Sequence, residues 1–133
     1  MEISLRAALI TWLGADPALS GELNAIAEEA PSRTSLPWLA IAASASSDWS
    51  SKTHQGREVR LALELHCRGD QPDAAASIFA AIEQRIEAMP AAQSDFAVIS
   101  CQFFRSRVEQ RGESRRVMLI EYRVAFRPPD GPP

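Results

Sequence analysis

The sequence contains few of the residues on which catalytic and metal-binding sites depend. It has two histidines, two cysteines and six scattered glycines in 133 residues. It therefore lacks a glycine-rich phosphate loop, and it also lacks a serine nucleophile elbow, a paired CxxC and an HExxH motif. His66 and Cys67 are neighbours in a strand-like stretch, so they point to opposite faces and cannot ligate one metal without distortion. We expect no catalytic residue, no cofactor and no metal site, and infer that the protein is not an enzyme.

Long apolar runs and an excess of basic charge are also missing. The N-terminal region reads neither as a signal peptide nor as a membrane span. The formal net charge of -3 argues against a general nucleic-acid binder, which would usually be clearly basic. A hydrophobic content of 46% is enough for an ordinary core. We expect one domain over residues 1–127, followed by a disordered proline-rich tail over residues 128–133.

The two cysteines are widely spaced. Cys67 and Cys101 each fall on the apolar side of an expected strand. This placement favours two reduced thiols in the core, although spacing alone leaves a disulfide open.

Residues 96–127 predict two long strands joined by a tight turn. On the second arm, apolar residues recur at every other position, which gives a strand with one apolar face. A two-residue turn at Arg111 and Gly112 would use the glycine for a positive φ. This turn sets the expected cross-strand pairs: Phe103 with Ile120, Cys101 with Tyr122, Ile99 with Val124, and Ala97 with Phe126.

Periodicity predicts the remaining elements. Residues 2–13 form a helix with an apolar face that includes Trp12, and residues 38–45 and 58–68 form strands. A second helix is expected to start after a capping residue, Asp70, and to end at Pro90. Its expected buried stripe consists of Ala75, Phe79, Ile82, Ile86 and Met89. Alternation within residues 22–28 allows one more short strand.

Together these elements predict an α+β fold. We expect an antiparallel or mixed sheet of four to five strands, with two helices packed on one face and a long hairpin at the C-terminal end. Ile120, Tyr122 and Val124 should then be buried beneath the helices.

Two surfaces are candidates for a protein interface. The sheet face away from the helices would carry Phe104 and Leu119 among polar residues, and a half-apolar face on a small protein suggests a partner. The polar segment 46–55 contains an isolated Trp49 together with Lys52 and Thr53. An aromatic residue in such a loop is typical of an interface, while the alternative is a tryptophan folded back on its own sheet. We expect this loop to be mobile in the free subunit.

Charge is distributed unevenly along the chain. Residues 105–116 hold five arginines and two glutamates, whereas residues 16–31 hold four acidic residues and no basic one. We expect Arg111 and Arg115 in the hairpin tip of one subunit to contact Glu28 and Glu29 of the next. The alternative is that the tip and both glutamates are simply solvated. A pair of catalytic carboxylates is disfavoured because no partner residue accompanies Glu28 and Glu29.

The order of elements and several short motifs resemble a known family. A short N-terminal helix rich in Leu and Ala is followed by Leu36-Pro37-Trp38-Leu39. The most specific motif, Asp48-Trp49-Ser50-Ser51-Lys52-Thr53, precedes Gly56-Arg57-Glu58 and an alternating strand. With the alanine-rich helix and the final hairpin, this pattern over residues 2–127 resembles the tail-terminator or tail-completion proteins of tailed phages and gene transfer agents.

The resemblance implies a structural role in a virion or gene-transfer-agent tail that is assembled in the bacterial cytoplasm. Such proteins close the tail tube as a ring, usually hexameric, and form the surface that docks to the head-side connector or adaptor protein. The implied partners are other copies of the chain, the major tail tube protein and the connector, with DNA only as cargo through the lumen and no membrane. The alternatives are a head-completion or stopper subunit of the connector, a small-ligand-binding α+β module and, last, a small enzyme.

Overall fold

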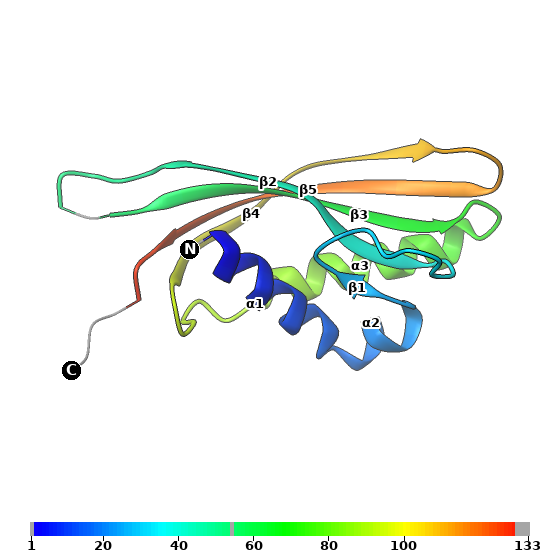
Figure 1. Cartoon of the computed structure of the whole chain (residues 1–133), viewed down its shortest axis with the longest axis horizontal. Coiled ribbons are helices and arrows are strands. Elements are labelled where there is room, and N and C mark those ends of the chain that lie inside the picture. Colours follow the sequence, from blue (N-terminus) through cyan, green and yellow to red (C-terminus); the bar gives the residue numbers. More distant parts are fainter. Residues whose placement is uncertain (1, 54, 130–133) are drawn as a thin grey trace.

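The structure is a computed structural model that describes residues 2–53 and 55–129. Three helices and five strands follow one another along the chain: α1 (Glu2–Gly14), α2 (Pro17–Glu22), β1 (Ile26–Ala27), β2 (Trp38–Asp48), β3 (Arg57–Arg68), α3 (Pro72–Glu87), β4 (Ala97–Gln110) and β5 (Arg115–Arg127). The strands form one sheet in the order β1-β2-β3-β5-β4, in which β1 runs parallel to β2 and all other neighbours are antiparallel. All helices lie on one side of this sheet (Figure 1). The predicted α+β architecture with a mixed sheet and a C-terminal hairpin is confirmed.

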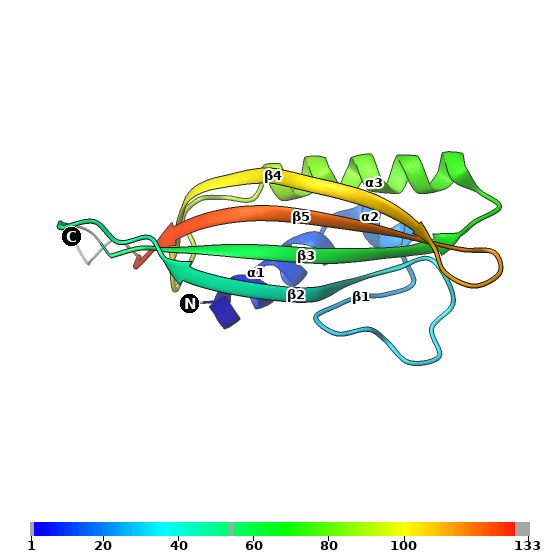
Figure 2. The same cartoon turned by 90° about the horizontal axis from the view of Figure 1, so that it is seen from above.

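The core lies between the sheet and the helices. Ile120, Tyr122 and Val124 on β5 are buried, as expected. They lie on the same face of the sheet as their partners on the neighbouring strand β3. The alternating residues of β3 on that face are also buried: Val59, Leu61, Leu63, Leu65 and Cys67. α1 contributes Leu5, Leu9 and Leu13 at helical spacing. Seen from above, the long strands extend beyond α1 at the end that carries the β2–β3 hairpin, and most of α3 lies beyond the β4 edge of the sheet (Figure 2).

Trp12 lies at the margin of this core rather than at its centre. It is only half-buried. Its indole N–H donates to the carbonyl oxygen of Arg85 at 2.6 Å, and the Arg85 guanidinium lies 3.4 Å from the centre of the indole ring. Arg85 Nε donates in turn to the carbonyl oxygen of Trp12 at 2.9 Å. These contacts join α1 to α3.

α3 differs in two details from the sequence-based expectation. Asp70 does not cap it: the N-cap residue is Gln71, without a side-chain cap, and Asp70 pairs with Arg68 at 3.3 Å. The buried residues of α3 are Ala75, Ile78, Ile82 and Ile86. Phe79 and Met89 pack only partly against the core because the helix turns Ile78 inward instead.

The register predicted for the hairpin is wrong. Phe103 lies opposite Tyr122 and Cys101 opposite Val124, whereas Ile99 falls in one of two bulges of β4 and is 47% exposed. The turn covers residues 111–114, with positive φ at both Gly112 and Ser114. Each bulge adds one unpaired residue to β4 and so shifts its pairing with β5 by one position. Apolar residues of the two strands can therefore share a face in a register that strict alternation does not predict.

Residues 17–37 contain more structure than the sequence indicated. A strand within residues 22–28 is present, but only as Ile26–Ala27. α2 was not predicted; Asp16 caps it by accepting a hydrogen bond from the Ala18 N–H at 3.1 Å. At the other end of the chain, residues 130–133 of the expected disordered tail lie outside the described residues, so that expectation stays a prediction.

The first test concerns the core under α3. Ile82 is fully buried, so we predict that Ile82→Ala lowers the free energy of unfolding by about 2–5 kcal/mol through lost burial and a residual cavity. Gln84→Ala, at an exposed position of the same helix, should change it by less than about 0.5 kcal/mol. Urea unfolding followed by circular dichroism measures both. Equal effects of the two substitutions would contradict this packing.

The second test concerns the thiols, which are not joined in a disulfide. Burial raises the pKa of the Cys67 thiol and raises the pKa of Cys101 to about 11. Because the thiolate is the reactive form, Ellman's reagent at pH 8 should react slowly with the native protein. It should react rapidly in urea, where both thiols regain a pKa of about 8.5. Rapid labelling of the native protein would contradict the burial.

Candidate assembly interface

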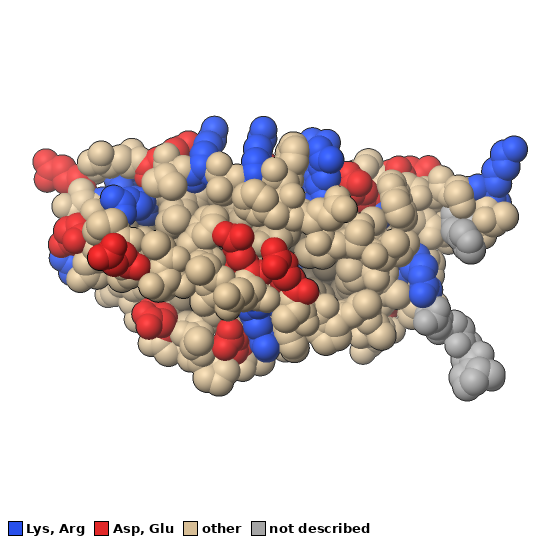
Figure 3. Space-filling model, turned by 180° about the vertical axis from the view of Figure 1, so that it is seen from behind, with Lys and Arg blue, Asp and Glu red and all other residues tan. Residues whose placement is uncertain are grey.

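The face of the sheet opposite the helices has no covering layer among the described residues. Basic side chains stand along this face, at the upper edge of the molecule in Figure 3. Phe104 lies half-buried among three of them: the guanidinium carbons of Arg123, Arg105 and Arg60 are 4.1, 5.1 and 5.3 Å from its ring centre. Leu119 is half-buried on β5. The predicted placement of Phe104 and Leu119 on an open face agrees with these positions.

Charges of both signs alternate on this open face. Arg105 pairs with Glu121 on the neighbouring strand, and Arg107 pairs with Glu109 at 3.0 Å. The open face is therefore mainly polar, with charges of alternating sign, and is not a continuous apolar surface. The exposed apolar side chains of Phe103 and Val108 lie on the other face of β4, because they pair with Tyr122 and Met118.

β4 forms one edge of the sheet. The loop before it reaches only its first residues, where Val98 N–H donates to the Ala91 carbonyl oxygen at 2.8 Å. From Ile99 onward, the sheet gives β4 a neighbour on one side only. Phe103 and Val108 are 45% and 58% exposed, and both pair with β5 residues, Tyr122 and Met118, that belong to or pack against the core. The underside of this edge is therefore an uncovered apolar ledge, which the sequence analysis did not identify as a site.

The opposite edge is formed by β2 and is covered for only two residues. β1 pairs with Leu39 and Ala40, which leaves residues 42–48 without a strand partner on that side. The side chains there are small, because the segment consists of Ala42, Ala43, Ser44, Ala45, Ser46, Ser47 and Asp48. Another backbone could approach this edge closely.

The β2–β3 hairpin projects past the helices at one end of the molecule (Figure 1). Residues 46–48, expected in a loop, belong to β2 because they pair with residues 57–59 of β3. Trp49 is 47% exposed, and its backbone N–H donates to the Gly56 carbonyl oxygen at 2.9 Å. A Cβ on Gly56 would lie 3.3 Å from the indole, so the glycine lets the ring rest against the hairpin. Lys52 and Thr53 are exposed beyond it, and His54 lies outside the described residues.

Arg111, in the tip of the β4–β5 hairpin, is engaged within its own chain. Its guanidinium donates to Glu109 at 3.0 Å and to Glu64 on β3 at 3.2 Å. The same Glu64 oxygen lies 2.8 Å from Nε2 of His66, whose ring is stacked on Trp38 at 3.8 Å. Burial lowers the pKa of His66, against the opposing effect of Glu64. The tip is thus held against the sheet by a chain of polar contacts.

The acidic residues Glu28 and Glu29 lie beside the β2 edge. Glu28 pairs with Arg6 of α1 at 3.3 Å, and both glutamates line a hollow of about 360 Å³ together with Arg6, Trp38, Glu64 and residues 40–42. Within one chain the structure pairs neither Arg111 nor Arg115 with these glutamates. The contact predicted between the tip and the acidic segment therefore requires a second copy.

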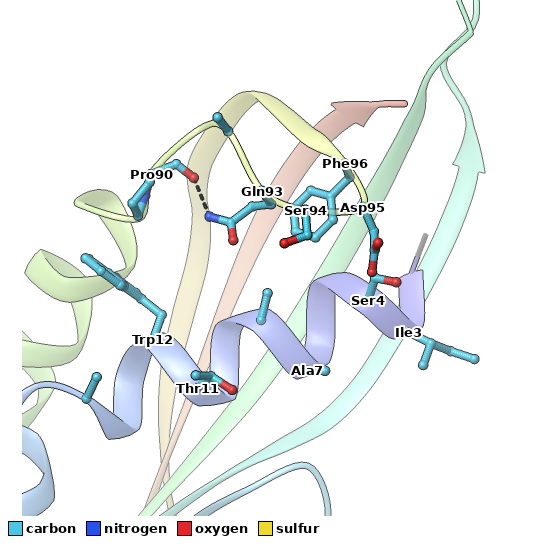
Figure 4. A pocket seen from close by; sticks show the side chains of 13 residues that line it. Ile3, Ser4, Ala7, Thr11, Trp12, Pro90, Gln93, Ser94, Asp95 and Phe96 are labelled. Atoms are coloured by element: carbon cyan, nitrogen blue, oxygen red, sulfur yellow. Dashed lines mark hydrogen bonds between the residues drawn. The ribbon is translucent and has the colours of Figure 1, made fainter. Parts of the chain in front are cut away.

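A groove of about 580 Å³ lies between α1 and residues 90–96 (Figure 4). Its floor is formed by small side chains of α1 such as Ala7 and Thr11. Trp12 lies at one end and Ser4 and Asp95 at the other. The Gln93 amide donates to the Pro90 carbonyl oxygen at 2.7 Å, within its own loop. The polar groups are therefore spread along the groove instead of converging on one point, as ligand sites require.

Residues 2–53 and 55–129 contain no cluster of three metal-ligating side chains. None of the described helices has the length and apolar character needed to cross a membrane.

Comparison with known proteins identifies the family. The family described as Tail completion protein gp17 matches residues 7–127. The chain belongs to this family. It is therefore a structural protein of a phage-type tail, and the predicted resemblance is confirmed.

This tail-completion protein also has a relative of known structure. A chain from the structure titled "Virion of native gene transfer agent (GTA) particle" aligns with a TM-score of 0.80 at 17% identity, over 92% of this chain and 94% of that one. At this identity the likeness shows a shared fold. No curated protein sequence matches the chain.

The third test concerns the hairpin of this tail-completion protein that carries Trp49. Few buried contacts hold residues 49–53 and 55, so we predict fast amide hydrogen exchange in this hairpin in the free subunit and slow exchange once the protein is incorporated into tails. Residues 59–65 of β3, buried in both states, serve as the internal control. Equal exchange of residues 49–55 in both states would show that this hairpin makes no assembly contact.

Proposed function

We propose that this protein closes the end of the tail tube as a ring, usually of six subunits, and provides the surface on which the head-side connector docks. Family membership supports a role in the tail. The origin of the structural relative in a gene transfer agent virion agrees with a place in such a particle. The observation that most supports a ring is the distribution of charge across the sheet.

Charge is distributed unevenly across the sheet. Arg105 and Arg107 lie on the edge strand β4, while Glu28 and Glu29 lie beside the β2 edge. A contact between unlike surfaces of identical subunits is heterologous, and it generates a closed ring when the rotation between neighbours closes. A two-fold contact between two β4 edges, or between two β2 edges, would instead bring like charges together. The arrangement therefore favours a ring over a dimer.

The remaining surfaces have roles in this proposal. The projecting hairpin with Trp49, Lys52 and Thr53 is positioned to contact the tail tube protein or the connector, beyond the body of the ring. DNA passes through the lumen as cargo. A stopper subunit of the connector would bind the head-side proteins without the tube. Electron microscopy of purified tail tubes mixed with this protein separates the two functions, because a tail terminator adds a ring at the tube end.

The fourth test reverses the charge of the tip. Arg111→Glu with Arg115→Glu should weaken ring assembly at low salt, and adding Glu28→Lys and Glu29→Lys in the same chain should partly restore it. Exposed ion pairs contribute only about 0–1 kcal/mol each, so we expect weaker assembly rather than complete loss. Ring formation is measured by native mass spectrometry, or on tube ends where the free protein is monomeric.

Two controls accompany this test. Arg111→Gln with Arg115→Gln removes the charges without reversing them and should have an intermediate effect. Because Arg111 binds Glu64 of its own chain, and Glu64 lines the same hollow as Glu28 and Glu29, lysines at positions 28 and 29 could also act within one subunit. A mixture of the tip-reversed chain with a separate chain that carries only Glu28→Lys and Glu29→Lys removes this ambiguity, because no chain then holds both changes and only a contact between subunits restores assembly. Assembly of the charge-reversed protein at the wild-type level at low salt would mean that the tip is solvated.

A further inference from the structure

The two open edges of the sheet are complementary in direction. Each step along the sheet from β2 to β3, β5 and β4 is antiparallel, so β2 and β4 run in opposite directions. Rotation about a ring axis brings the β4 edge of one subunit next to the β2 edge of its neighbour without reversing either. The two strands therefore meet antiparallel, the commoner form of pairing.

The two edges are also complementary in shape and polarity. The β4 edge offers the exposed side chain of Phe103, in line with Ser44, and β2 has only small side chains over residues 42–47. Long edges of this kind, with unpaired backbone groups, are templates for pairing with another chain. The bulges of β4 accompany its visible curvature (Figure 2), which suits a sheet that continues around an axis.

The rows across the sheet show which charges would meet. Ala43 is in line with Ala62, Glu121 and Arg105, and Ala40 is in line with Glu64, Leu119 and Arg107. Arg105 and Arg107 therefore lie at the same level of the sheet as the hollow that Glu28 and Glu29 line with Ala40 and Ala42. Their side chains are 69% and 70% exposed, so both can reach outward while pairing locally.

We propose that residues 99–105 of β4 in one subunit pair antiparallel with residues 42–48 of β2 in the next copy, so that the sheet runs on from subunit to subunit. The pairing places Arg105 and Arg107 beside the glutamate hollow of the neighbour. It rests on the proposed ring and specifies how the subunits of that ring are joined. The partner of this edge is a second copy of the chain. Backbone hydrogen bonds hold the two strands together, and the charges determine how far one strand is shifted along the other.

Cysteine cross-linking tests the pairing. Ala45 and Gln102 are exposed, lie on the open face and belong to one row with Arg60 and Arg123. A subunit with Ala45→Cys and Gln102→Cys keeps every charged residue. Within one subunit the two positions are three strand spacings apart, about 14 Å, which is too far for a disulfide. Mild oxidation of the ring should therefore give a ladder of covalent multimers.

Several cysteine positions on β2 are tested, because the shift of one strand along the other decides which position lies opposite residue 102. With Gln102→Cys kept, cysteine is placed at Ala43, Ala45 or Ser47 on the open face, or at Ser44 or Ser46 on the opposite face. We expect at least one position of the first group to cross-link tenfold more than either position of the second, because neighbouring residues of a strand point to opposite faces. Protein that carries only the native Cys67 and Cys101 measures the background.

Each outcome is decisive. Rings that form while all five pairs stay unlinked, or link equally, would overturn the edge pairing and leave the proposed ring standing. A covalent dimer from Gln102→Cys alone would mean that two β4 edges meet about a two-fold axis, and would overturn the head-to-tail arrangement. Failure of the wild type and of every variant to form an oligomer, even on tail tubes, would overturn the proposed function and the pairing together.

Discussion

Backbone N–H and C=O groups along a strand need hydrogen-bond partners, and in this fold the sheet ends before that need is met on both sides. The helices cover one face, β1 covers two residues of β2, and β4 has a strand on one side only. Water satisfies an exposed edge in a free subunit, but such an edge remains a template for another chain. The uncovered apolar ledge at Phe103 and Val108 makes completion by a neighbour more favourable still.

Much of the fold could be predicted because it follows from local pattern. The alternation of β3 and β5 and the apolar stripe of α1 fixed which side of each element is buried. The register of the last hairpin could not be predicted, because bulges arise from backbone hydrogen-bond geometry that alternation does not record. Ile99 shows the consequence: its place in the pattern predicts the core, and a bulge leaves it exposed.

The site was predictable only in part, for a related reason. Trp49 and Phe104 stood out as aromatic residues in polar surroundings, and both lie on candidate contact surfaces. The β4 edge did not stand out, because the order of strands in a sheet is a tertiary property. The same holds for Arg111, whose partner Glu64 is 47 residues away in sequence, so a tip expected to reach the next subunit is held by its own sheet.

Electron cryomicroscopy of tails that carry this protein, at a resolution that separates neighbouring strands, tests the central claim most directly. We predict a ring at the tube end in which β2 of each subunit lies one strand spacing, about 4.8 Å, from β4 of the next, with the helices on one side of a continuous sheet. Subunits that meet through α1 and α3, with both sheet edges exposed to solvent, would contradict it.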